Sequence, residues 1–466
     1  MFDTYYFWKR SYHTLNLGAI RNLNITHRIT NFFMKNKLLF TVFFVLLSVA
    51  ATIAQAKLKA IKAGKLIDVV NGIVLTNQVI LIDSNRITRV GAGITIPPNT
   101  EIIDLSNATV LPGLIDCHTH LSFQAGDNYY EDIFRKTPID YAVRAPAYLK
   151  RTLEAGFTMC RDLGSHDLID ISLRNAVNDG SIIGPRMLVS AFPIGSTGGH
   201  MDITGFNPDL SWKSNKDFTG VADGVEEIRK RVRNNIKWGA DWIKFAASGG
   251  VLSEEETLGK PQYTFEEMKA LCDEAHMWGK KVAAHVYGTE AIKLALKAGV
   301  SSIEHGSLID DEGIQLMKEK GAYLIADVYI DDYILNEYAK KGYPEKILNK
   351  ERMVKKMQLI NISKAYKAGV KVAYGTDAGG YPHGWNAKQF PYMVTFGLTP
   401  MQAIQSATIN AADLLDWKDK TGSISEGKLA DIIAVEKNPV SDIKVLEEVK
   451  FVMKEGVIYK NELNRQ

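Results

Sequence analysis

Short apolar segments alternate with helical patterns through residues 112–420 of the chain. Amphipathic stretches such as 264–278 and 289–297 lie between the apolar segments. Strands that alternate with helices indicate βα units and a parallel sheet. The expected strands are residues 114–118, 157–162, 186–190, 242–246, 282–285, 301–305, 322–326 and 371–375. Eight such strands predict an α/β fold of the closed (β/α)8 TIM barrel type.

The regions on either side of the expected barrel have a different pattern. Residues 57–111 and 421–466 contain short alternating segments of β type, with polar turns between them. Neither region is large enough to bury a good core alone. We therefore expect both ends of the chain to combine into one small β-sandwich domain.

Residues 34–56 have the pattern of a secretory signal peptide. Lys35 and Lys37 form a basic start, residues 38–49 an apolar core, and Ala54-Gln55-Ala56 a small-residue cleavage site. The apolar core is shorter than the roughly 20 residues of a membrane-spanning helix. We expect export to the periplasm or secretion, with no stable membrane anchor after cleavage; an uncleaved anchor is the alternative. Residues 1–33 are interpreted as a mis-assigned upstream extension.

Composition and charge limit the kinds of partner that the protein is expected to bind. With 46% hydrophobic and 23% charged residues, the chain is of ordinary globular type. Its net charge of +3 comes from residues 1–56, which hold six Lys or Arg and one Asp (+5), so the remainder carries −2. No nucleic-acid partner is indicated. The three cysteines, an odd and widely spaced set, form no disulfide framework. The sequence leaves open whether the protein forms a homo-oligomer.

The candidate chemistry begins at His118-Thr119-His120, which ends an apolar strand. Residues two apart on a strand point to the same side, so both imidazoles could bind one metal ion. Four later strands also end in or contain a residue able to bind metal. These residues are Lys244, His285, His305 and Asp377. Strand ends meet at one face of a barrel, where such folds build their active sites.

This ordered set resembles the metal-dependent amidohydrolase superfamily across nearly all of the chain after residue 57. The resemblance implies two divalent metal ions: Zn²⁺ suits the site, and Mn²⁺, Co²⁺ and Fe²⁺ also bind such ligands. His118 and His120 would hold one ion and His285 and His305 the other. Lys244, carboxylated by CO₂, would bridge them as a carbamate. Asp377 would bind metal and act as the catalytic proton carrier.

Three further features complete the expected site. Tyr287 lies two residues beyond His285, and the resemblance makes it a donor to the developing oxyanion; a packed aromatic ring is the alternative. Gly198, Gly199 and His200 end a glycine-rich loop that resembles the family's receptor for a substrate carboxylate; a turn with an exposed histidine is the alternative. His383 is placed at the rim as a substrate contact. Asp162 is expected to be structural.

The loops 248–253, 302–306 and 381–386 resemble the branch that contains Xaa-Pro dipeptidases, with imidazolonepropionases as mononuclear relatives. The implied function is hydrolysis of a C–N bond in a small-molecule substrate, a dipeptide or N-acyl amino acid. Alternatives are a cyclic-amide hydrolase or deaminase, and a non-catalytic binding relative. The last usually loses metal ligands, whereas all six are present here.

Overall fold

The computed structural model describes residues 58–463 except 126–131, 133–134, 203, 205–218 and 255–257. The chain divides into two compact units, Met1–Ala56 and Lys57–Gln466, and every described residue belongs to the second. The predicted signal peptide and upstream extension therefore lie outside the described residues. Among the described helices, none combines the length and apolar character required to cross a membrane.

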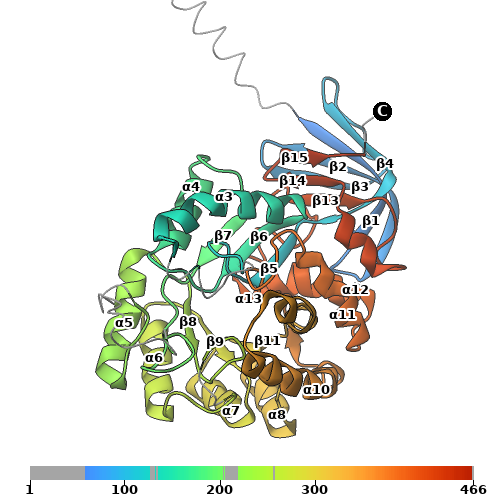
Figure 1. The fold of residues 1–466 in the computed structure, drawn as a ribbon. Coiled ribbons are helices and arrows are strands. Elements are labelled where there is room, and N and C mark those ends of the chain that lie inside the picture. The colour runs from blue at the N-terminus through green and yellow to red at the C-terminus, as the bar shows by residue number, and fades with distance from the viewer. Residues whose placement is uncertain are drawn as a thin grey trace, which may run out of the picture. The chain divides into compact units, whose positions relative to one another are not determined.

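Strands from both ends of the chain share one seven-stranded sheet, in the order β15-β14-β13-β4-β1-β2-β3. It lies beside the helix-rich part of the fold (Figure 1). Arg86 in β3 also bridges to Leu429, so this edge contacts the segment that leads into β13. The strands are β1 (Lys59–Asp68), β2 (Ile73–Asp83), β3 (Arg86–Ala92), β4 (Glu101–Pro112), β13 (Ile432–Val435), β14 (Phe451–Lys454) and β15 (Val457–Asn461).

The sheet has its own apolar core, to which Ile61 and Ile80 from the first half and Ile432 and Phe451 from the second contribute. Burial of these side chains from both chain ends stabilises the sheet. The two layers of the predicted sandwich are not separate sheets in the structure. The β4 strand continues to Pro112 and leads directly into the first strand of the central region.

The eight strands expected in the central region are all present, and the predicted α/β class is confirmed. They form two parallel sheets, β5-β6-β7 and β12-β11-β10-β9-β8. The strands are β5 (Leu114–Thr119), β6 (Phe157–Asp162), β7 (Arg186–Val189), β8 (Ile243–Ala246), β9 (Val282–Val286), β10 (Ser302–His305), β11 (Tyr323–Ile325) and β12 (Lys371–Val372).

Hydrogen bonds connect the two parallel sheets at two seams, one between the β7 and β8 edges and the other between the β5 and β12 edges. Next to β7, the N–H of Ile194 donates to Lys244 O and that of Ala246 donates to Ile194 O, both at 2.8 Å. At the other seam, the Cys117 N–H in β5 donates to Tyr374 O at 2.8 Å, and Thr119 bridges to Ala378. The backbone groups at the sheet edges are therefore paired across both seams.

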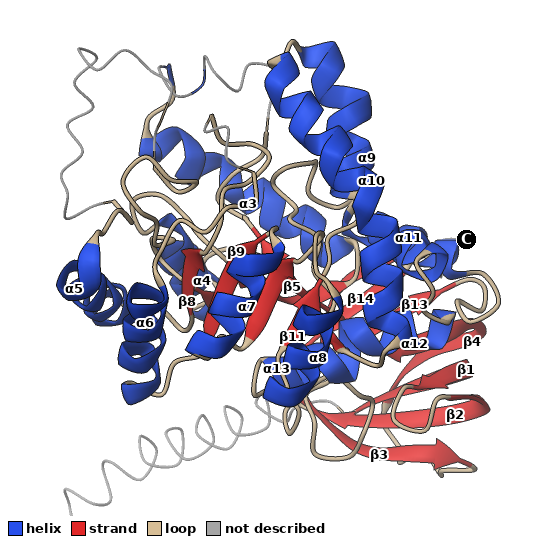
Figure 2. Ribbon diagram, turned by 90° about the horizontal axis from the view of Figure 1, so that it is seen from below, coloured by secondary structure: helices blue, strands red, loops and turns tan. Residues whose placement is uncertain are grey.

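Helices surround these strands (Figure 2). They are α3 (Pro138–Glu154), α4 (Ile169–Asn178), α5 (Gly224–Trp238), α6 (Phe265–Met277), α7 (Thr289–Ala298), α8 (Asp311–Lys320), α9 (Ile330–Tyr333), α10 (Glu345–Lys367), α11 (Gln389–Thr395), α12 (Pro400–Gln405) and α13 (Ala411–Leu414). Two π-helical turns, Ile334–Tyr338 and Ser406–Asn410, and three 3₁₀ turns, Ala339–Lys341, Asn386–Lys388 and Ile443–Glu448, complete the described helices.

Local sequence fixes the ends of α6 and α7, the two helices expected from their amphipathic pattern. A capping box begins α6, because the Thr264 side chain accepts from the Glu267 N–H while Glu267 accepts from Thr264. Helix α7 ends at Gly299, whose φ of 110° lies where a side chain would be strained. Helix α6 leads into the buried strand β9 and helix α7 into β10, so these helices help to position His285 and His305 on those strands.

Candidate metal centre and active site

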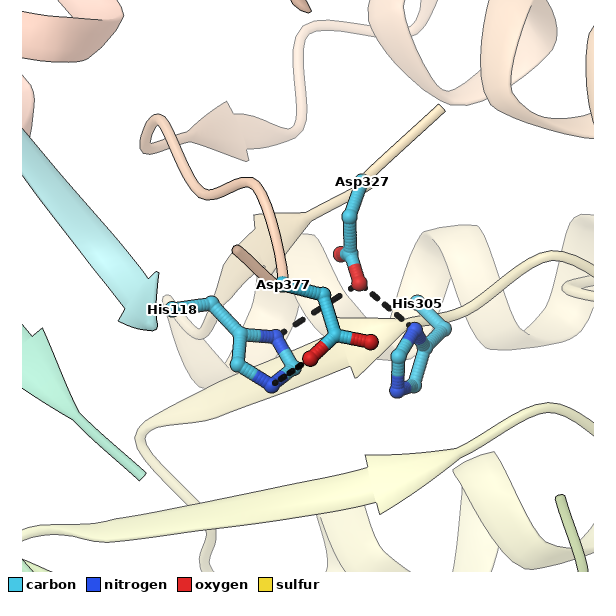
Figure 3. Close-up of side chains that lie close together, drawn as sticks. All are labelled: His118, His305, Asp327 and Asp377. Carbon is cyan, nitrogen blue, oxygen red and sulfur yellow. Dashed lines mark ion pairs between the residues drawn. The ribbon is translucent and has the colours of Figure 1, made fainter. Parts of the chain in front are cut away.

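Four buried or half-buried side chains converge beyond the carboxyl ends of the central strands (Figure 3). His118, His305, Asp327 and Asp377 each offer a ligand atom, and these atoms lie within 4.8 Å of one another. Asp327 Oδ2 lies 2.7 Å from His305 Nδ1 and 3.5 Å from His118 Nδ1. Asp377 Oδ1 lies 3.5 Å from His118 Nε2. Imidazole nitrogens and carboxylate oxygens at this spacing suit a divalent transition metal.

Two more predicted ligands adjoin this group. His120 Nε2 lies 3.3 Å from Asp377 Oδ1, while its Nδ1 lies 3.0 Å from Gly164 O, a contact that orients the ring. His285 Nδ1 lies 2.8 Å from His305 Nε2. The structure therefore brings together five of the predicted residues: His118, His120, His285, His305 and Asp377.

Asp327 is the site residue that sequence reasoning missed. It lies two residues beyond β11, and His120 and Asp377 also lie beyond the ends of their strands, β5 and β12. A signal was available, because 322–326 was an expected strand and an acidic residue comes directly after it. The Asp327 carboxylate is fully buried and holds His305 Nδ1, which fixes the ring and leaves Nε2 directed at His285.

The backbone at two of the ligands is strained. His305 and Asp377 have φ values of 68° and 56°, in the left-handed region that non-glycine residues seldom occupy. His305 is the last residue of β10, and Asp377 lies in the loop after β12, so each left-handed residue redirects the chain beyond a strand. Strain of this kind persists only where surrounding structure enforces it, and it concentrates at functional sites.

Several buried polar atoms without a hydrogen-bond partner indicate that these residues fit a metal ion. Within the described part of the chain, His118 Nδ1, His285 Nε2 and Asp327 Oδ1 are buried without a hydrogen-bond partner. Burying unpaired polar atoms costs free energy, and a buried charge costs more. Cations held among these atoms would offset that cost. The donor set therefore fits divalent metal.

The proton equilibria of the carboxylates agree with a cation-binding site. Burial acts to raise the pKa of Asp377, but the neighbouring His118 and His120 outweigh it and hold the pKa below its usual value. Burial likewise acts to raise the pKa of Asp327, and His305 and His118 lower it further than burial raises it. Both groups are therefore anions at neutral pH.

Lys244 extends from β8 and is almost fully buried. Burial lowers the pKa of its ammonium group, and the Glu304 and Asp377 carboxylates act in the opposite direction. Glu304 already forms an ion pair with Arg161, whose Nη2 donates to Glu304 Oε1 at 2.9 Å. Arg161 also donates to Cys117 O and lies over the Trp242 ring. Lys244 is thus a buried amine whose charged form is disfavoured.

Two further carboxylates support the ligand loops. Asp116 Oδ2 accepts from Thr376 Oγ1 at 2.6 Å and from Asn386 Nδ2 at 2.8 Å, which ties β5 to the loop of Asp377. Asp162 accepts from the N–H of Leu121, which follows His120, and from the N–H of Gly164, whose carbonyl contacts His120 Nδ1. Burial raises the pKa of each carboxyl to about 7. Asp162 therefore has the structural position that was expected.

Tyr287 lies beside the candidate metal ligands. Its ring stacks on His305, with centroids 4.6 Å apart and planes at 11°. The Tyr287 N–H donates to Ser248 Oγ at 3.0 Å, which fixes the backbone beyond β9. Burial raises the pKa of the phenol well above its ordinary value, so the hydroxyl keeps its proton.

His200 reaches the same cluster, with its ring stacked on His285 at a centroid distance of 3.9 Å. His200 Nδ1 lies 2.8 Å from Ser253 Oγ, and the His200 N–H donates to Gln262 Oε1 at 2.9 Å. Burial lowers the pKa of His200 to about 3. The loop that was predicted to receive substrate therefore places its histidine beside a predicted metal ligand.

The predicted role of the glycines before His200 needs correction. The Gly198 N–H donates to Asp202 Oδ2 at 2.8 Å and the Gly199 N–H to Ser196 O at 3.0 Å. Gly198 has a φ of 73°, so it serves a tight turn. Both N–H groups are used within the turn and are not free to bind a substrate anion.

Gly250 explains why the loop after β8 is glycine-rich. A β-carbon on Gly250 would lie 2.4 Å from His200 Cε1 and 2.7 Å from His285 Nε2. Any larger residue would push these two rings apart. The Ser248-Gly249-Gly250 sequence therefore allows the backbone to lie directly against the His200–His285 stack.

His383 is also buried near the site, but its polar contacts are to the protein. Its Nε2 lies 2.7 Å from Phe123 O, its N–H donates to Gln124 Oε1, and its ring stacks on Tyr148. Burial lowers the pKa of His383 to about 4. The structure gives this histidine a role in holding the segment that follows His120.

Comparison with known proteins agrees with this geometry. Residues 109–459, which span all eight central strands and every candidate metal ligand, match the amidohydrolase family. The chain belongs to the amidohydrolase family. It is therefore a hydrolase that acts on carbon–nitrogen bonds, as its family and its ochratoxinase and dipeptidase relatives support.

Individual relatives of this amidohydrolase cover most of its length. It is 35% identical over 435 residues to the ochratoxinase of Aspergillus niger, covering 88% of each chain. It is 24% identical over 401 residues to the imidazolonepropionase of Fusobacterium nucleatum, covering 77% of this chain and 85% of that one. A crystal structure of a Xaa-Pro dipeptidase with methionine in its active site has a TM-score of 0.83 and 40% identity, covering 87% of this chain and all of that one.

Proposed function

We propose that this amidohydrolase is an exported binuclear enzyme that hydrolyses the amide bond of a dipeptide or an N-acyl amino acid. One observation carries the proposal: the His118, His305, Asp327 and Asp377 cluster, with His120 and His285 adjoining it, is placed beside a histidine that could receive a substrate group. Hydrogen bonding at both seams supports a closed (β/α)8 barrel as the scaffold.

The proposed cofactors are two divalent ions, Zn²⁺ being the expected metal and Mn²⁺, Co²⁺ or Fe²⁺ also suited to the ligands. His118, His120 and Asp377 would hold one ion, and His285 and His305 the other. A carbamate formed from Lys244 and CO₂ would supply a shared anion. The lowered pKa of Lys244 supports this, since only the neutral amine can react with CO₂. When bound, the ions would make water a stronger nucleophile and polarise the scissile carbonyl.

The residues of the chain then have separate tasks. Asp377 is an anion within reach of two histidines, and it would take a proton from the attacking water and deliver it to the leaving nitrogen. Tyr287 keeps its hydroxyl proton and stacks on His305, so it would donate to the oxyanion that develops on the carbonyl. Asp327 would keep His305 in its working orientation.

The substrate carboxylate is assigned to His200. Because the neighbouring N–H groups are used within the turn, the His200 ring must supply the contact itself. A carboxylate close to the ring would favour the protonated imidazole and produce a charge-assisted hydrogen bond. Such an anchor would hold the adjacent amide in place for attack. The methionine in the Xaa-Pro dipeptidase relative, a free amino acid in an active site, supports this substrate class.

Free-carboxylate substrates are therefore expected to be hydrolysed better than their C-terminal amides. The expected preference is roughly 10- to 100-fold in kcat/KM, the effect of one hydrogen bond to a charged group. His200→Ala should reduce the preference, and parallel assays of each acid and its amide would measure it. Equal turnover of acids and amides by the wild type would refute the carboxylate anchor and favour the cyclic-amide alternative, for which the imidazolonepropionase relative is the support.

Export is proposed from the leader sequence alone. The basic start, apolar core and Ala54-Gln55-Ala56 place the expected cleavage before Lys57. N-terminal sequencing of the exported protein should therefore begin at Lys57. Recovery of residues 38–56 with the protein in a membrane fraction would contradict cleavage and favour an anchor.

A further inference from the structure

Helix α10 supports two of the active-site loops through polar side chains. Lys350 Nζ donates to Gly250 O at 2.8 Å and to Ser253 O at 2.6 Å, both in the loop after β8. Further along the helix, Gln358 Nε2 donates to Ser307 Oγ at 3.3 Å and Asn361 Nδ2 to Ser307 O at 3.0 Å. Ser307 lies two residues beyond His305. One helix therefore holds the backbone beside two different strands of the site.

The Lys350 contacts continue as far as His200. Ser253 Oγ donates to Gly250 O at 3.3 Å and lies 2.8 Å from His200 Nδ1. The His200 ring in turn stacks on His285. A continuous chain of contacts thus leads from the helix to the proposed carboxylate receptor and to a metal ligand.

The position of Lys350 makes these contacts costly to lose. The side chain is buried, with 8% of its surface exposed. The Gly250 backbone lies directly against His200 and His285, since a β-carbon there would collide with both rings. If the ammonium were removed, Gly250 O and Ser253 O would lose charge-assisted hydrogen bonds in a water-poor setting. The loop would then lose the contact that fixes it beneath the two histidine rings.

We propose that Lys350 is a positioning residue that sets the preference for substrates with a free carboxylate, by clamping the Gly250–Ser253 loop and so holding His200 in place. This inference rests on the proposed function, because His200 is the carboxylate receptor there. The positive charge of Lys350 also acts on His200, among other charges. Lys350 thereby adds to an electrostatic environment that favours an anion.

The test compares Lys350→Met with Lys346→Met. Methionine keeps an unbranched side chain and removes the charge. Lys346 lies one turn earlier on α10, and its ammonium pairs with Glu254 of the same loop at the protein surface. Lys350→Met is expected to raise KM for a free-acid dipeptide about 10- to 100-fold, to change kcat less, and to affect the C-terminal amide much less. Lys346→Met should behave as the wild type.

A second readout does not depend on activity. Amide hydrogen exchange in residues 247–253, which leave out the Lys346 partner Glu254, should become faster in Lys350→Met than in Lys346→Met. If the wild type hydrolyses no amide, the proposed function fails. The comparison of hydrogen exchange would still decide whether Lys350 clamps the loop. Unchanged exchange and unchanged KM in Lys350→Met would overturn the inference. An equal rise of KM for acid and amide would reduce Lys350 to a structural role and also overturn it.

Ser253→Ala covers the case in which Lys350→Met does not fold. It removes only the hydroxyl that contacts His200, and it should raise KM for acids in the same direction. Where both variants fold, the double variant should lose less than the sum of the single losses, since the two residues act through one chain of contacts. Fully additive losses, or no loss of acid preference in Ser253→Ala, would overturn the proposed route to His200.

Discussion

Lys244→Ala is expected to lower bound metal below about two ions per chain and to reduce kcat/KM by about 10³-fold or more. The reason is that the proposed carbamate would supply a ligand to both ions, so its loss would remove a ligand from each. Lys244 is almost fully buried in β8, and alanine leaves no polar group to take its place. Elemental analysis after loading with metal and bicarbonate, together with amidase assays, would measure both effects.

The matched control for this variant is His276→Ala. His276 is an exposed histidine in the last turn of α6, so its loss should leave metal content and activity unchanged. Full activity of Lys244→Ala with two ions bound would end the carbamate proposal. A loss of one ion with retained hydrolysis would show that a single metal is sufficient.

Asp377→Asn is expected to reduce kcat by roughly 10²- to 10⁴-fold, the range for loss of a general acid–base group. The amide keeps the size of the side chain but cannot take a proton from water. Asparagine also tolerates the left-handed backbone at this position, so the fold should survive. Steady-state assays with the metal-loaded variant would measure the loss, and thermal unfolding would report on stability.

Asp416→Asn is a closely matched control. Asp416 has a φ of 58°, close to the 56° of Asp377, and it pairs with Lys281 at the protein surface. The same substitution is therefore made in the same backbone conformation, away from the ligands. Activity of Asp377→Asn within a factor of a few of this control would exclude Asp377 as the proton carrier.

Much of the scaffold and site could be predicted from the sequence because both depend on local pattern. Buried parallel strands are largely apolar, as in β9 apart from His285 and in β11, and they stand out between amphipathic helices. Their ends converge in space, so the sequence alone allowed His118, His285 and Asp377 to be grouped into one site. Asp327 follows the same pattern after β11, although the sequence analysis did not group it with the site.

Other features depend on which partner a polar group or ring meets in the folded chain. The Gly198 and Gly199 N–H groups looked available in the sequence, yet Asp202 and Ser196 accept from them. His383 looked like a rim residue, and its partners Phe123 and Tyr148 lie far away in sequence. The clamp by Lys350 joins residues 100 positions apart. Which of several nearby acceptors a polar group uses is decided by tertiary packing, and sequence periodicity does not contain that information.

The most direct test of the proposed binuclear amidohydrolase is a metal titration of the mature protein with bicarbonate present, followed by release of free amino acids from a library of dipeptides and N-acyl amino acids. Ochratoxin would be included in the library because of the ochratoxinase relative. Amide hydrolysis should be absent after chelation, rise with bound metal and level off at about two ions per chain. A protein that binds two ions and still cleaves no amide in the library would contradict the proposed function.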